Sequence, residues 1–229
     1  MGFDPELIEP VILSLQVAVV ATLFALPLSV AVAWILSRKQ FKGKLLLESI
    51  VMAPLVIPPL VTGYLLLLLL GKNGFIGGFL FRTFGIHIAF NWTGAAVAAG
   101  VMAFPLMVRA IQLSLDSINS DLEKMARTLG ARRSDTFRTI TLPLIMPGII
   151  SATILGFARS LGEFGATIVV AGNMPGKTQT IPLAIYSAIN RPGGEKVAMT
   201  LLLVSLVLSV VSLIISHYMG KQVHALRQH

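Results

Sequence analysis

Two oppositely charged side chains, Arg159 and Glu163, lie inside a long apolar stretch of the chain. They are the only opposite-charge pair inside a predicted membrane span, and their i, i+4 spacing places them on one face of a helix. Charged groups are costly within a bilayer, so they usually pair with each other or face a water-filled cavity. The pair therefore either lines the outer mouth of a path through the membrane or neutralises itself as a structural element.

Three prolines, Pro54, Pro58 and Pro59, cluster near the middle of another apolar stretch. Each proline removes a backbone N–H donor and pushes a helix open. Backbone carbonyls that are freed at membrane depth are tolerated only in a protein interior or a wet cavity, and broken helices near the midplane often mark a transport path. Pro58 and Pro59 are therefore candidates for a path or gate, and the alternative is a simple kink that shapes packing.

Five apolar segments are long enough to cross a bilayer, which takes about 20 residues. The expected spans are 11–36, 45–70, 93–113, 144–171 and 197–216. Only 12% of the residues are charged, whereas a soluble domain carries roughly twice that fraction. The sequence thus predicts an all-α integral membrane protein, with one transmembrane domain over residues 8–217 and a tail over 218–229.

Small residues recur every four positions in two of these spans, and such ridges let helices approach closely. The residues are Gly148, Ala152, Gly156 and Ser160 in the fourth span and Ala95, Ala99 and Ala103 in the third. We expect both ridges to serve packing, either within the chain or across a dimer axis.

A patterned polar stretch separates the third and fourth spans. Ser120 followed by Glu123 predicts a capping box and a short helix, which Gly130 would end in a left-handed conformation. A second short helix, capped by Ser134, would stop at Pro143. The first helix would carry an apolar stripe at i, i+3, i+4 and i+7, formed by Leu122, Met125, Ala126 and Leu129. Such a stripe needs a partner groove to bury it, unless the stretch is a packed hairpin without a partner.

This stretch resembles the EAA loop of ABC importer permeases, which reads Glu-Ala-Ala, three residues, Gly, nine residues, Ile, one residue and Leu-Pro. Lys124 and Met125 stand where the leading Glu-Ala would be, and Glu123, displaced by one residue, is expected to substitute for that glutamate. The resemblance implies that residues 119–143 form a cytoplasmic loop that docks on a separate ATPase subunit. The positions in register are Ala126, Gly130, Ile140, Leu142 and Pro143.

A second resemblance covers nearly the whole chain. The run from Phe157 to Tyr186, FARSLGEFGATIVVAGNMPGKTQTIPLAIY, is similar to the molybdate branch of the oxyanion permeases in the same family. Further similar runs are Pro54–Leu67, Gly74–Gly77 and Phe104–Ala110, and sulfate and thiosulfate permeases share part of the pattern. The resemblance implies a type I ABC importer permease fold, a homodimer joined to two ATPase subunits, and an extracytoplasmic molybdate-binding protein.

Several kinds of chemistry are not supported by the residues. The chain has no cysteine for disulfides or thiolate-bound metals, and its four histidines show no zinc-protease pattern. The run AGNMPGKT from Ala171 nearly spells a phosphate-binding loop, but it lacks the first glycine and the strand–loop–helix context. We expect no catalytic residue, metal site or cofactor in this chain.

The basic residues predict the orientation of the chain in the membrane. Eleven lie in the 37–44 loop, the 114–143 loop and the tail, against five in the regions on the opposite side. The N-terminus is therefore expected outside, and the C-terminus in the cytoplasm of a bacterium or archaeon, with the spans in the inner (plasma) membrane. Because the net charge of +8 is concentrated beside the spans, it does not indicate nucleic-acid binding.

The resemblance implies that the chain is the permease subunit of an ATP-driven importer of molybdate, with tungstate as a chemical near-twin. An alternative within the same class is a sulfate or thiosulfate permease. An alternative from another class is a channel or secondary transporter that needs no ATPase.

The predicted topology can be tested by cysteine labelling, because the chain has no native cysteine. Arg132→Cys, in the basic loop, should react in intact cells only with membrane-permeant thiol reagents. Labelling of this position by an impermeant reagent added outside would overturn the assignment.

Overall fold

The structure, a computed structural model, describes residues 5–225, except for the side chains of residues 120, 133, 213 and 215–225. Between residues 5 and 225 the chain forms helices and no strand, so the predicted all-α class is confirmed. The helices are α1 (Pro5–Arg38), α2 (Lys44–Val56), α3 (Pro59–Leu70), α4 (Phe75–Phe84), α5 (Trp92–Asp116), α6 (Ser120–Thr128), α7 (Arg133–Thr136), a π-helix (Phe137–Thr141), α8 (Leu142–Leu161), α9 (Gly165–Ala171), α10 (Ile181–Ile189) and α11 (Glu195–Ala225).

Five helical segments within the described residues are long and apolar enough to cross a membrane. They are Pro5–Arg38, Pro59–Phe84, Trp92–Asp116, Ser134–Leu161 and Glu195–Ser212. The second of these begins at the proline cluster, in the middle of the predicted 45–70 span. The end of the predicted tail, residues 226–229, lies outside the described residues.

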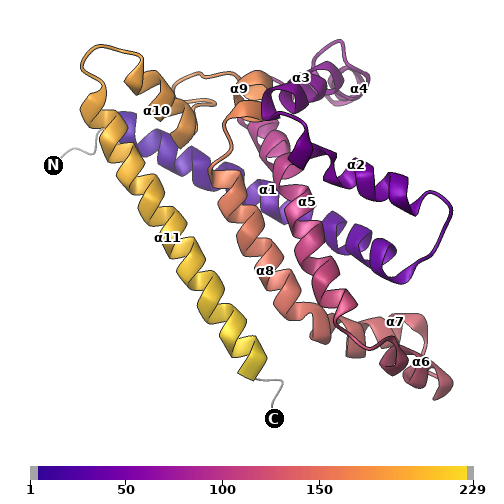
Figure 1. The fold of residues 1–229 in the computed structure, drawn as a ribbon. Helices are drawn as coiled ribbons and strands as arrows, with labels where there is room; N and C mark the ends of the chain where they lie inside the picture. The colour runs from indigo at the N-terminus through magenta and orange to yellow at the C-terminus, as the bar shows by residue number, and fades with distance from the viewer. Residues whose placement is uncertain (1–4, 226–229) are drawn as a thin grey trace.

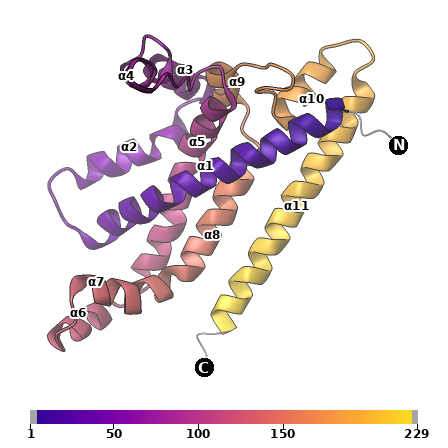
Figure 2. The ribbon, with the colours of Figure 1, turned by 180° about the vertical axis from the view of Figure 1, so that it is seen from behind.

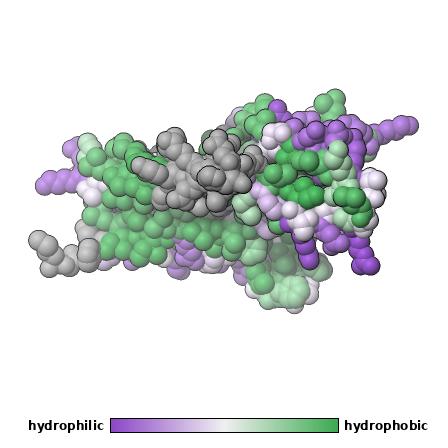
Figure 3. Space-filling view, turned by 90° about the horizontal axis from the view of Figure 1, so that it is seen from below, coloured by the Kyte–Doolittle hydropathy of each residue, from purple (hydrophilic) through white to green (hydrophobic). Residues whose placement is uncertain are grey.

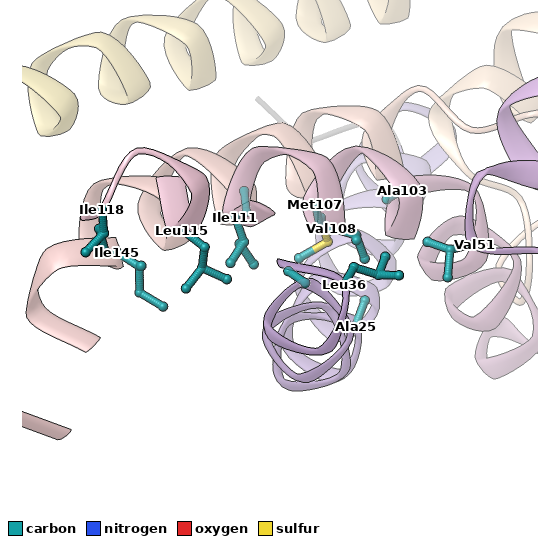
Figure 4. Packing of buried hydrophobic residues seen from close by; sticks show 12 residues of the cluster. Ala25, Leu36, Val51, Ala103, Met107, Val108, Ile111, Leu115, Ile118 and Ile145 are labelled. Atoms are coloured by element: carbon teal, nitrogen blue, oxygen red, sulfur yellow. The ribbon is translucent and has the colours of Figure 1, made fainter. Parts of the chain in front are cut away.

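Helix α5 is central to the arrangement, with α1 and α8 packed along it and α11 on the outside against α8 and α10 (Figures 1 and 2). Its buried face contributes Met107, Ile111 and Leu115 to the main hydrophobic cluster. Figure 4 shows these side chains in a row along the helix, with Leu36 of α1 and Ile145 of α8 near them. The core is therefore a seam between three helices.

The predicted ridge of small residues on α8 faces α5 and is buried along its whole length. A Cβ added to Gly148 would lie 2.3 Å from the Ser114 Cβ, and one added to Gly156 would lie 2.5 Å from the Met107 Sδ. The alanine ridge of α5 is buried as well, with Ala95 and Ala99 against α1. Both ridges thus serve packing within the chain, where close contact replaces the hydrophobic drive that lipid does not provide.

Two of the predicted spans are interrupted. The 45–70 range is divided between α2 and α3 by Ile57 and Pro58, which are extended. The 144–171 range is divided between α8 and α9 by residues 162–164. Pro54 stays inside α2, so the break coincides with the second proline, Pro58, and the third, Pro59, begins α3.

Figures 1 and 2 show that α6, α7 and the C-terminal end of α11 lie at one end of the molecule. Helices α3, α4, α9 and α10 lie at the other end, together with the first residues of α1. This arrangement agrees with the grouping of loops by basic residues, and the sidedness relative to the cytoplasm stays a prediction.

The glycine ridge predicts a graded response to added methyl groups. Gly148→Ala should cost about 1–3 kcal/mol of stability, because the Ser114 Cβ is close to the backbone and the helices must separate. Gly156→Ala should cost less, since the flexible Met107 side chain can move. Thermal unfolding in detergent measures both, with Gly162→Ala as the control, because its Cβ meets nothing within 4 Å. Equal unfolding midpoints for all three variants would show that the ridge is not tightly packed.

Candidate functional site

Helix α6 begins as predicted, but its cap is different. The N-cap is Asn119, whose side chain accepts a hydrogen bond from the Asp121 N–H at 2.9 Å. The predicted capping box of Ser120 and Glu123 is therefore wrong. Asparagine is among the preferred N-cap residues, and its use leaves Glu123 free for tertiary contacts.

Glu123 joins three parts of the chain. Its Oε1 accepts a hydrogen bond from the Thr141 hydroxyl at 2.9 Å and lies 3.3 Å from the Arg38 Nη2. Arg38 ends α1, and Thr141 ends the π-helix that precedes α8. The displaced glutamate of the loop thus holds α6 against the end of α1 and the π-helix that precedes α8.

The apolar stripe of α6 is on the surface, as predicted. Leu122, Met125 and Leu129 are 46%, 64% and 89% exposed, and Ala126 is half-buried. Gly130 has φ +93°, the left-handed conformation expected of a C-terminal turn. Figure 3, seen from the end that carries α6 and α7, shows hydrophobic surface among hydrophilic side chains on its right-hand side. The loop therefore presents an uncovered apolar surface.

The second half of the loop differs from the prediction. Pro143 does not stop a separate short helix, because α7, the π-helix and α8 follow one another without interruption. The Leu142 N–H donates to the Phe137 carbonyl, and Pro143 lies in the first turn of α8, where a missing N–H is tolerated. This continuous helical segment comprises the 28 residues Ser134–Leu161. Ile140 and Leu142 are half-buried within it.

The two interrupted spans meet at their breaks. A Cβ on Gly165 would lie 2.8 Å from the Pro59 Cβ, and one on Gly63 would lie 2.8 Å from the Ala166 Cα. Helices α3 and α9 therefore pack backbone against backbone. The structure thus places the candidate gate at Pro58 and Pro59 beside the segment that contains Glu163.

Arg159 and Glu163 form an ion pair, with 2.7 Å between Nη1 and Oε2. They are not on one continuous helix, because α8 ends at Leu161 and the C-cap is Gly162. Glu163 instead accepts a hydrogen bond from the Ala166 N–H at 2.9 Å in the first turn of α9. The Glu163 side chain is 2% exposed and that of Arg159 29%. Glu163 is thus a buried structural group, and Arg159 is the member of the pair that reaches a surface.

A second ion pair, between residues of two different predicted spans, was missed by sequence reasoning. Arg109 of α5 and Glu48 of α2 approach to 3.6 Å, and the Arg109 Nη1 donates a hydrogen bond to the Gln112 Oε1 at 3.2 Å. The partners lie on different spans, so a search for pairs within one helix could not find them. A usable signal was present, because only four charged residues fall inside the five predicted spans: Glu48, Arg109, Arg159 and Glu163.

Residues 17–224 match the family described as "Binding-protein-dependent transport system inner membrane component". The chain belongs to this family. It is 54% identical to the molybdenum transport system permease protein ModB of Escherichia coli (strain K12), over 95% of each chain. It is 52% identical to ModB of Haemophilus influenzae, over 94% of each chain, and 36% identical to the sulfate transport system permease protein CysT of Salmonella typhimurium, over 90% of this chain and 75% of that one.

Solved structures give the same fold. The methionine ABC transporter MetNI in inward-facing conformations matches with a TM-score of 0.74 and 20% identity, over 95% of each chain. A bacterial ABC transporter that imports the acidic polysaccharide alginate matches with a TM-score of 0.73 and 18% identity, over 97% of this chain and 84% of that one. The predicted type I ABC importer permease fold is confirmed, and the chain is a transport component rather than an enzyme.

Glu123 is expected to hold α6 in place. Glu123→Gln leaves the largely buried Arg38 without its counter-charge and should raise hydrogen exchange of α6 amides by roughly tenfold, for a loss of about 1.4 kcal/mol. Asp121→Asn is the matched control, because its pair with Lys124 is exposed and lies within α6. Equal exchange rates in the two variants would contradict this role.

The Arg159–Glu163 pair should behave as a buried structural pair. Arg159→Gln strands a buried carboxylate and should cost about 3 kcal/mol, whereas the double variant Arg159→Gln/Glu163→Gln should recover much of that loss. Glu163→Ala should be less stable than Glu163→Gln, which keeps an acceptor for the Ala166 N–H. Unfolding midpoints of the purified variants measure these differences. A double variant less stable than either single change would refute the structural role.

Proposed function

We propose that the chain is the membrane-spanning permease subunit of an ATP-driven importer of molybdate. The observation that supports molybdate as the substrate is the difference in sequence identity, which is 54% with a molybdenum permease and 36% with a sulfate permease. The sulfate or thiosulfate reading is the second candidate, because those permeases share much of the chain. Tungstate, which has the same charge and shape as molybdate, is an expected second cargo.

The exposed stripe of α6 supports a separate ATPase as the cytoplasmic partner. Leu122, Met125 and Leu129 present apolar surface at one end of the molecule, and an amphipathic helix of this kind fits a groove. Gly130 sets the turn that follows, and Ile140, Leu142 and Pro143 carry the chain onward into α8. We propose that Ala126, the half-buried member of the stripe, lets α6 lie close to the second half of the loop.

Movement of the docked loop would be transmitted to the spanning helices through two contacts of Glu123. Glu123 connects α6 to the end of α1 through Arg38, and to the base of α8 through Thr141. We propose that ATP binding draws two ATPase subunits together and that the loops of two copies of this chain follow them. A homodimer would form one path at the shared axis, with an extracytoplasmic molybdate-binding protein at the opposite end.

The adjacent breaks of the two interrupted spans support the proposed path. Pro58 and Pro59 open one span beside Gly165 of the other, so the packing there can change without unfolding a long helix. Arg159 offers a partly exposed cation close to this point, where an oxyanion would pass. Glu163 holds Arg159 and the start of α9 in place.

The function is tested in liposomes of bacterial inner-membrane lipid that contain this chain together with its ATPase, with the binding protein added on the external side. We expect uptake of radioactive molybdate that requires ATP and the binding protein, and competition by tungstate but not by excess sulfate. Uptake that persists without ATP would support a channel or secondary transporter. ATP-dependent uptake of sulfate in preference to molybdate would establish the second candidate.

A further inference from the structure

The pair formed by Glu48 and Arg109 includes one charge inside a spanning helix, α5, where charged groups are costly. Arg109 lies seven residues before the end of α5, about 10 Å along the helix axis, and Glu48 is one turn inside α2. The side chains are 54% and 33% exposed, so neither is enclosed by the protein. Exposure of these groups to lipid at that depth would be costly, and they therefore face water or a second protein surface.

Arg109 belongs to an open face of α5. Most of this helix is buried against α1, α8 and the α3–α9 pair, whereas Leu113 is 60% exposed and Leu106 is half-buried. With Arg109 they follow at spacings of three and four residues, on one side of the helix. This open strip runs between α2, which carries Glu48, and α8, which carries Arg159.

The register of α5 against α8 places the two arginines at different depths. Gly148 lies opposite Ser114 and Gly156 lies opposite Met107, so the helices are antiparallel and Arg159 is level with residue 104. Arg109 is then five residues nearer the coupling loop, or roughly 7–8 Å along the axis at 1.5 Å per residue. On α8, Arg159 follows the exposed Leu155 by one turn, on the same side of the helix. Arg109 thus lies nearer the coupling loop, and Arg159 nearer the breaks of the two interrupted spans.

Arg109 is held more loosely than Arg159. Its closest approach to Glu48 is 3.6 Å, compared with 2.7 Å in the Arg159–Glu163 pair. Arg109 donates a hydrogen bond to the side chain of Gln112, a residue of α5 that is only 7% exposed. A guanidinium carries five N–H donors, and most of those on Arg109 are open to a further acceptor.

We propose that Arg109, Gln112 and Glu48 form an inner oxyanion station of the transport path. A tetrahedral dianion accepts two hydrogen bonds from the Arg109 guanidinium and displaces the Glu48 carboxylate. When the anion leaves, Glu48 and Arg109 form their ion pair again. Gln112 holds the guanidinium through its Oε1. This inference rests on the proposed function, since it requires the cargo to be an oxyanion.

Uptake by the liposome-reconstituted complex tests the station. At equal membrane content, Arg109→Gln should lower molybdate uptake by at least about tenfold, as expected when a charged hydrogen-bond donor is lost. The double variant Glu48→Gln/Arg109→Gln should be no better, and Arg109→Lys should recover part of the uptake. Arg82→Gln, an equal charge change on exposed α4, is the control and should transport normally. Recovery in the double variant would show a merely structural pair and overturn the proposal.

Water access gives an independent test that does not depend on the folding of Arg109 variants. Leu106→Cys lies one turn deeper than Arg109 on the open face and should react with a charged, water-soluble methanethiosulfonate, more slowly when molybdate is being transported. Leu203→Cys on α11, 56% exposed and in the middle of a spanning helix, is the control for a lipid-facing cysteine. Equal rates at the two positions would overturn the proposal.

The uptake assays distinguish an error in the proposed substrate from an error in the proposed site at Arg109. A wild-type complex that imports sulfate instead of molybdate refutes the substrate, and the same variants assayed with sulfate then decide the role of Arg109. A wild-type complex that imports no oxyanion refutes both. Full molybdate uptake by Arg109→Gln refutes the station alone.

Discussion

The close approach of α5 to its two neighbours is the constraint on which the rest of the structure depends. In a bilayer, apolar side chains gain little by meeting each other rather than lipid, so helices associate where small residues allow dense contact. Gly148 against Ser114 leaves no space for a methyl group, and the small alanine side chains of α5 pack against Val17 and Ala21 of α1. This contact fixes the register of α8 on α5 and hence the depth of every charged side chain that the two helices carry.

The interrupted spans are stabilised by each other. A helix that ends within a membrane leaves backbone carbonyls and N–H groups without partners, at a cost of several kcal/mol for each group that stays unsatisfied. Here the Pro58 carbonyl accepts hydrogen bonds from Val61 and Thr62, and Glu163 accepts one from Ala166. Because Gly165 packs on Pro59, neither break can be straightened without disturbing the other. The breaks are thus built features of the fold, and Arg159 is positioned by them.

Features that depend on local pattern were predictable from the sequence. The five apolar segments, the ridge of small residues, the stripe on α6 and the left-handed Gly130 all follow from composition or from the period of one helix. Features that depend on contact between helices were not. The pairing of Glu48 with Arg109 joins two spans, and Glu123 left its expected capping role because Arg38 and Thr141 are brought to it by the fold. Pro143 was misread for a related reason, since the π-helix before it changes which carbonyl needs a donor.

The uninterrupted helix through Pro143 determines how motion would be transmitted through the molecule. A loop that ended there would be a flexible tether, and motion of α6 would be lost before it reached a span. Instead the 28 residues Ser134–Leu161 form one uninterrupted helical segment, which contains the π-helix and runs from the base of the loop to the turn that carries Arg159. A π-turn within a helix is often found at a functional site. Here it ends at Thr141, whose hydroxyl donates a hydrogen bond to Glu123. In the proposed coupling, a small tilt of α6 would therefore be transmitted along α8 to its far end, next to the break at Pro58.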